Sequence, residues 1–179
     1  MKKINIYDTR KRVDFPLYVA AVDAVQMDGR RRIRSGSDAV EILERAFQMR
    51  SLTEERVVML CLDTVGKPLG MFCVAFGALS WCSVRMADVF KKALAINAAS
   101  IIVAHNHPSG DITPSGHDIT FTQHLAVAGA LIGLTVLDHI IIGTQAGDCN
   151  DYYSFRETSS QFFETAEQKA ATLVAEGDI

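Results

Sequence analysis

Short apolar runs separated by turn and helix signals restrict the fold of this chain more than any other feature of its sequence. Residues 57–62 and 69–76 predict two strands, and the turn-forming residues 64–68 between them predict a hairpin. Residues 100–104 form a short apolar run that is typical of a strand buried on both faces. Residues 134–142 predict a further strand, so a sheet is expected at the centre of the fold.

Helical patterns occupy the segments between these strands. Val40, Leu43 and Phe47 fall on one helical face, and Asp38 with Glu41 three residues later predicts the start of that helix. Two further helices and one N-terminal strand are expected at residues 88–98, 115–129 and 17–27. The order helix, hairpin, helix, strand, helix, strand predicts a layered α/β domain with a mixed sheet.

The composition narrows the class of protein. With 179 residues, of which 49% are hydrophobic and 22% charged, the chain suits one globular domain with a full core rather than a disordered protein. Its four cysteines form no Cys-x-x-Cys pair, which argues against a thiolate zinc knuckle or a redox dithiol. The N-terminus has no apolar signal segment, and no apolar run reaches the roughly 18 residues of a membrane span. We therefore expect a cytoplasmic protein that contacts no membrane.

Charge is unevenly distributed, although the formal net charge is only −3. Residues 1–50 contain eleven Lys and Arg against seven Asp and Glu. Two small basic clusters lie in this region: Arg10, Lys11, Arg12 and Arg30, Arg31, Arg32, Arg34. Such a run is most often a solvated face, but it also suits a weak contact with nucleic-acid phosphates or with an acidic partner.

The tail of the chain, residues 157–179, is acidic and has apolar residues at roughly helical spacing. Those residues are Phe162, Phe163, Ala166, Ala170, Leu173 and Val174. This pattern predicts an amphipathic helix whose apolar face packs on the core or on a partner, which includes a second copy of the chain.

One segment carries residues suited to metal chemistry. His105 and His107 lie two residues apart at the end of a predicted strand, so their imidazoles point to the same side. The Pro- and Gly-containing residues 108–114 predict a turning loop that brings the chain back toward them. Ser115 and Asp118 then share one face at the start of a helix, where Asp118 can supply a carboxylate as third ligand.

Two imidazoles and one carboxylate suit a single Zn²⁺, and a fourth position left to water distinguishes a catalytic zinc from a structural one. Such a site needs a proton acceptor, for which Glu55 is a candidate, although spacing alone does not select it over Glu54. Other interpretations remain open: His-x-His is a weak pattern by itself, and Ser115 with Asp118 also forms a capping box. His139 suits either a partner of the site or a hydrogen-bonded core histidine.

The pattern Glu…His-x-His-x(7)-Ser-x-x-Asp resembles the motif of the JAMM (MPN+) metallopeptidases. Over residues 37–156 the chain is similar to the RadC-like branch of that family. The similarity rests on Leu62-Asp63, His105-Asn-His-Pro-Ser-Gly-Asp111, Pro114-Ser115, Leu137-Asp-His-Ile-Ile-Ile-Gly143 and Tyr152-Tyr-Ser-Phe155. The resemblance implies a JAB/MPN fold of cytidine-deaminase-like architecture, in which a mixed sheet lies between layers of helices.

The resemblance also implies roles for individual residues. Glu55, eight residues before the Asp of Leu62-Asp63, would be the general base, and His105, His107 and Asp118 would bind one zinc ion per chain. Ser115 would steady an oxyanion. The implied activity is cleavage of a peptide or isopeptide bond. The alternative is a catalytically idle zinc module in DNA repair, recombination or mobile-element function.

The expected organisation is a basic N-terminal extension at residues 1–36, the RadC-like domain at 37–156 and the acidic helix at 157–179. Thirty-six residues are too few for the helix-hairpin-helix region of longer RadC proteins, so the chain resembles a short form. A nucleobase deaminase is excluded because its Pro-Cys-x-x-Cys ligand pair is missing from the sequence.

Overall fold

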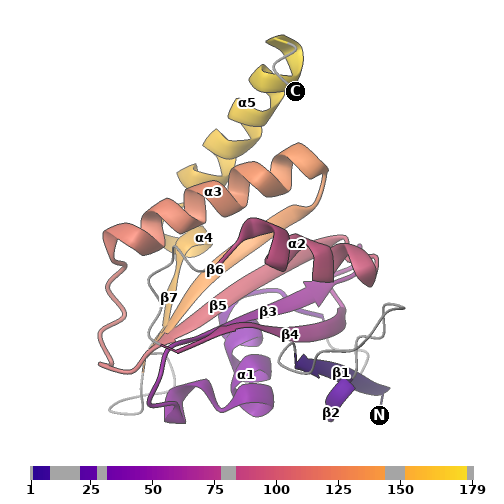
Figure 1. Ribbon diagram of the computed structural model, residues 1–179, viewed down its shortest axis with the longest axis vertical. Helices are drawn as coiled ribbons and strands as arrows, with labels where there is room; N and C mark the ends of the chain where they lie inside the picture. Colours follow the sequence, from indigo (N-terminus) through magenta and orange to yellow (C-terminus); the bar gives the residue numbers. More distant parts are fainter. Residues whose placement is uncertain (1, 9–20, 28–31, 78–83, 144–151, 177–179) are drawn as a thin grey trace.

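The computed structural model describes residues 2–8, 21–27, 32–77, 84–143 and 152–176. These residues form a mixed seven-stranded sheet with helices on both of its faces (Figure 1). The layered α/β architecture predicted from the sequence is therefore confirmed.

The sheet has the strand order β2-β1-β4-β3-β5-β6-β7. Its strands are β1 (Lys2–Asp8), β2 (Ala21–Met27), β3 (Arg56–Leu62), β4 (Pro68–Phe76), β5 (Ser100–His107), β6 (Thr135–Gly143) and β7 (Tyr152–Ser154). β1 pairs parallel with β4, and β5 pairs parallel with β6, whereas the other neighbours are antiparallel. β3 and β4 are the hairpin that the sequence predicts, and β5 lies between β3 and β6.

One face of the sheet is covered by α1 (Gly36–Phe47) and the other by α2 (Met86–Ala95) and α3 (Gly116–Ile132), as Figure 1 shows. The short 3-10 helix η1 (Met49–Ser51) follows α1. The helix α4 (Phe155–Thr158) follows β7, and the tail forms α5 (Gln161–Glu176), which packs on α3. The tail is thus helical, as expected.

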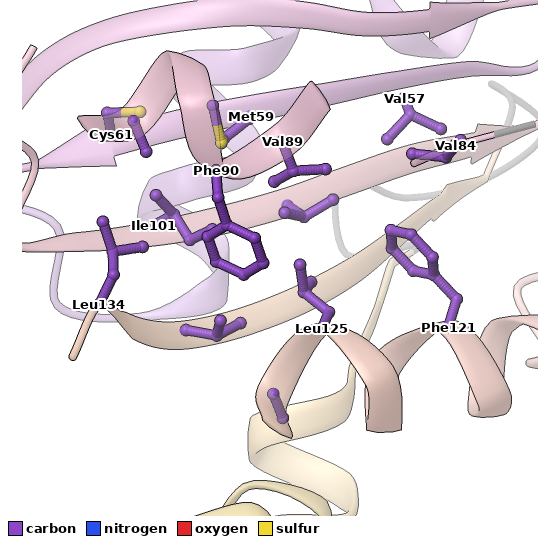
Figure 2. Close-up of a cluster of buried hydrophobic side chains, with 14 of the residues drawn as sticks. Val57, Met59, Cys61, Val84, Val89, Phe90, Ile101, Phe121, Leu125 and Leu134 are labelled. Carbon is purple, nitrogen blue, oxygen red and sulfur yellow. The ribbon is translucent and has the colours of Figure 1, made fainter. Parts of the chain in front are cut away.

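Each face of the sheet carries its own hydrophobic core. Alternate residues of β3 point to opposite faces, so that Met59 joins the α2 and α3 side, and Leu60 joins the α1 side. Phe90 from α2 and Leu125 from α3 meet over β5 in the first of these cores (Figure 2). Because both faces are covered, the central strands are continuous apolar runs, which explains why the sequence revealed them.

The sequence misjudged boundaries of the three helices α1, α2 and α3. The last of them, predicted to end at residue 129, continues to Ile132. Ser35, not Asp38, is the N-cap of α1, because its hydroxyl accepts the backbone N–H of Asp38. Asp38 therefore lies inside the first turn, and the N-cap is three residues earlier than predicted. α2 was predicted over residues 88–98 but begins at Met86 and ends at Ala95. Two residues after this end, Asn97 adopts a left-handed backbone with φ of 54°.

Two strands were missed, and part of one prediction lies outside the described residues. β1 has no apolar run, and β7 has only three residues. The predicted strand 17–27 is seen as β2 from residue 21 onward.

Among the basic clusters, Arg32 and Arg34 are exposed. The remaining members, Arg10, Lys11, Arg12, Arg30 and Arg31, lie outside the described residues. No helix within the described ranges has the length and apolar character needed to cross a membrane.

Candidate metal centre

Three side chains from two elements converge at one end of the sheet. β5 ends in His105 and His107, and the loop that follows leads into α3, whose first turn contains Asp118 (Figure 1). One ligand atom from each of these three residues lies within 4.8 Å of the others. The structure therefore brings together the three residues that the sequence singled out as metal ligands.

The start of α3 orients the carboxylate of Asp118. Ser115 is the N-cap: its backbone N–H donates to Asp118 Oδ2 at 2.7 Å, and its hydroxyl donates to the same oxygen at 2.6 Å. The backbone N–H of Asp118 in turn donates to Ser115 Oγ at 3.2 Å. The helix cap thus occupies Oδ2, which also lies 3.7 Å from His107 Nε2, and leaves Oδ1 to face His105 Nε2 at 3.2 Å.

The hydrogen bond at His107 Nδ1 identifies which of its nitrogens carries the proton. Nδ1 lies 2.6 Å from the carbonyl oxygen of Asp111. A carbonyl oxygen only accepts, so Nδ1–H is the donor, and in the neutral ring that a metal binds Nε2 carries the lone pair. The Asp111 carboxylate accepts the backbone N–H of Thr113 at 2.9 Å, which helps to hold the loop.

A chain of hydrogen bonds determines the tautomer of His105 in the same way. The Thr122 hydroxyl donates to the Asp118 carbonyl at 2.6 Å, so its oxygen accepts from His139 Nδ1–H at 2.7 Å. His139 Nε2 is then an acceptor, and His105 Nδ1–H donates to it at 3.1 Å. His105 Nε2 consequently carries the lone pair, and His139 is both a buried core histidine and a partner of the site.

In these tautomers the lone pair of His105 Nε2 faces two other electron-rich atoms. His105 Nε2 lies 2.9 Å from His107 Nε2 and 3.2 Å from Asp118 Oδ1. Asp118 is fully buried, and its Oδ1 has no hydrogen-bond partner. A buried carboxylate oxygen without a partner costs free energy, and so do facing lone pairs, unless a cation lies among them. Two neutral imidazole nitrogens and one carboxylate oxygen fit Zn²⁺.

The protonation states of His105, His139 and Asp118 depend on their burial and on their neighbours. Burial lowers the pKa of His105 and lowers that of His139 well below the usual value. Burial alone would raise the pKa of Asp118, but its contact with His105 and its hydrogen bonds from Ser115 hold that pKa below the ordinary range. The imidazoles of His105 and His139 are therefore neutral at pH 7, and Asp118 is an anion.

Glu55 lies on a polar cleft beside these residues. The cleft has a volume of about 360 Å³ and is lined by Glu55, His107, Ser109, Asp111, Thr113, Ser115 and His117. Glu54 does not line it and is exposed, so the geometry favours Glu55 where the spacing of the sequence did not decide. His124, on the helix beyond, is exposed.

Sequence reasoning overlooked Thr122 and Asn106. Thr122 is fully buried and links His139 to the Asp118 carbonyl. Asn106 is fully buried between the two histidines and contacts the segment that carries Glu55. Asn106 could have been found from the sequence, because it is a polar residue inside an apolar strand. Thr122 gave a weaker signal, because the hydroxyl of a helical threonine often bonds only the carbonyl four residues earlier.

Comparison with known proteins agrees with the family resemblance seen in the sequence. The family model described as RadC-like JAB domain matches residues 33–160. A UPF0758 protein of Roseiflexus castenholzii is 44% identical over 114 residues, which are 64% of this chain and 48% of that protein. A UPF0758 protein of Chloroflexus aggregans is 39% identical over 136 residues, covering 76% of this chain and 56% of the relative. The chain spans about half the length of the curated relatives that it matches.

Proposed function

This chain belongs to the RadC-like JAB domain family, and we propose that it is a zinc-dependent hydrolase of the JAMM type that cleaves a peptide or isopeptide bond. One observation carries the proposal: ligand atoms of His105, His107 and Asp118 lie within 4.8 Å of one another beside a polar cleft. A structural zinc site has four protein ligands, whereas three ligands beside a cleft leave a position for water.

Each residue has a chemical part in this proposal. His105, His107 and Asp118 hold zinc, which supplies a Lewis acid and lowers the pKa of a water molecule to about 7. Glu55, on the same cleft, accepts the proton of the attacking water and delivers it to the leaving amine.

Ser115 steadies the oxyanion of the tetrahedral carbon. Rotation of its hydroxyl toward the cleft frees this donor, while the Ser115 backbone N–H continues to hold Asp118 Oδ2. Removal of one oxyanion donor typically lowers kcat by about 10²–10³-fold.

The test combines metal analysis with cleavage of a panel of fluorogenic peptides and lysine-linked isopeptides. We expect one zinc per chain and cleavage that a chelator abolishes and zinc restores. Glu55→Gln should keep zinc but lose cleavage, whereas His107→Ala should lose both. Chelator-insensitive cleavage, or full activity in Glu55→Gln, would contradict the proposal.

A second candidate is a zinc module without catalysis that contacts nucleic acid in repair, recombination or mobile-element function. The basic excess of residues 1–50 favours it, and Arg32 and Arg34 are exposed at its edge. Binding of a DNA duplex that weakens with salt, and that is lost when Arg30, Arg31 and Arg32 are replaced by Gln, would support this candidate. Binding that is insensitive to both changes would argue against it.

A further inference from the structure

Asn106, between the two histidines, connects the metal centre to the segment that carries Glu55. Its side chain is fully buried. Nδ2 donates to the carbonyl oxygen of Glu54 at 3.1 Å, and Oδ1 accepts the backbone N–H of Arg56 at 2.8 Å. One amide group therefore holds the backbone immediately before and immediately after Glu55.

These two bonds continue the sheet beyond the point where its backbone pairing stops. The antiparallel pairing of β3 with β5 runs from Leu62 opposite Ser100 to Val57 opposite His105. At the next position the Asn106 side chain, rather than its backbone, bonds to the β3 strand. From the β4 side, the N–H of Gly77 donates to the carbonyl of Glu55 at 3.0 Å. The peptide groups around Glu55 are thus held from both neighbouring strands.

The chemistry at this position requires an amide of this length. A buried polar side chain is costly unless each of its polar atoms has a partner, and the Asn106 amide satisfies both of its ends on Glu54 and Arg56. An aliphatic residue offers neither bond, and a serine hydroxyl has a shorter reach. An aspartate lacks the donor that the Glu54 carbonyl needs.

We propose that Asn106 is a positioning residue that holds Glu55 at a set distance from the metal ligands. The inference rests on the proposed function, because it concerns the base of that reaction. Asn106 lies between His105 and His107 on β5. Its side-chain hydrogen bonds therefore link the Glu55 segment directly to the strand that carries two of the metal ligands. A displacement of about 1 Å in such a group costs roughly 10²-fold in rate.

The test uses the full chain loaded with zinc and compares Asn106→Ala and the milder Asn106→Ser with Asn97→Ala. Asn97 is exposed after α2 and has a left-handed backbone that alanine disfavours. This control therefore removes the same side-chain atoms and also weakens the fold. We expect both Asn106 variants to keep one zinc per chain, with kcat lowered about 10–100-fold and KM unchanged. Asn97→Ala should keep the wild-type kcat.

Two further measurements separate positioning from general damage. Adding Asn106→Ala to Glu55→Gln should cause no further loss of residual cleavage, because the change acts through Glu55. Amide hydrogen exchange of Arg56 should accelerate at least tenfold in the Asn106 variants, while Met59 in the centre of β3 stays protected. If Asn106→Ala does not fold, Asn106→Ser carries both measurements.

The inference is overturned by zinc loss parallel to the loss of activity, by additive effects with Glu55→Gln, or by unchanged Arg56 exchange. Absence of cleavage in the wild-type protein would contradict the proposed function alone. The hydrogen-exchange rate of the Arg56 amide would then show whether Asn106 holds the Glu55 segment.

Discussion

The hydrogen bond from His105 to His139 should control zinc affinity, and replacing His139 tests this. His139 stacks on Phe155 with an interplanar angle of 4°, so His139→Phe keeps an aromatic ring in the core but removes the acceptor for His105 Nδ1–H. His139→Gln is the matched control, because its side-chain oxygen can reach the place of Nε2 and accept that proton.

The expected magnitude follows from the tautomer of His105. Without an acceptor at Nδ1, the proton moves to Nε2 and bonds to Asp118 Oδ1, which lies 3.2 Å away. Zinc must then displace the proton that His105 Nε2 and Asp118 Oδ1, two of its ligand atoms, share. Loss of such a partner typically costs 10–100-fold in metal affinity, or about 1.4–2.8 kcal/mol.

The assay is competition for zinc with a chromophoric chelator at pH 7.5, with nitrogen-15 NMR of the imidazoles to identify the tautomer of His105. We expect a 10–100-fold weaker Kd in His139→Phe, a smaller change in His139→Gln and none in His124→Phe. His139→Phe protein that binds zinc with wild-type affinity and keeps its proton on His105 Nδ1 would refute the reasoning.

Three further changes test the fold around the site. Burial raises the pKa of Asp138 from 3.8 to about 6, so the folded state holds this proton more tightly, and stability falls as the pH rises from about 4 to about 6. Asp138→Asn should remove about 3 kcal/mol of that pH dependence in urea titrations. Parallel stability–pH curves for the variant and the wild type would contradict this. Gly129→Ala would place its Cβ 2.6 Å from the Leu134 carbonyl and should destabilise the protein by about 1–3 kcal/mol, whereas Gly116→Ala, which meets nothing within 4 Å, should have little effect on Tm. Ser115→Ala removes the cap of α3 and should cost about 1 kcal/mol in the same titrations, with Ser115→Thr close to wild type; equal stabilities of the Ala and Thr variants would exclude capping.

The candidate site was predictable where its chemistry depends on local geometry. His105 and His107 share a side because alternate residues of a strand do so, and Ser115 and Asp118 share a face because a helix turn spans them. The central strands were equally visible, since burial on both faces makes them continuously apolar.

The parts of the fold and of the site that the sequence did not predict depend on pairing between distant segments. β1 has a polar sequence, and β7 is too short for any periodicity. His139 reaches His105 only through the parallel register of β5 and β6, in which Val103 pairs with His139. Asn106 reaches the Glu55 segment across fifty residues of sequence, and no local pattern specifies that contact.

X-ray absorption at the zinc edge of the purified, zinc-loaded chain tests the central claim most directly. The account predicts one zinc per chain, bound by two imidazole nitrogens at about 2.0–2.1 Å and by oxygen ligands at about 2.0–2.2 Å. It also predicts that His107→Ala removes the metal. A sulfur shell at about 2.3 Å, zinc well below one per chain, or an unchanged spectrum in His107→Ala would contradict it.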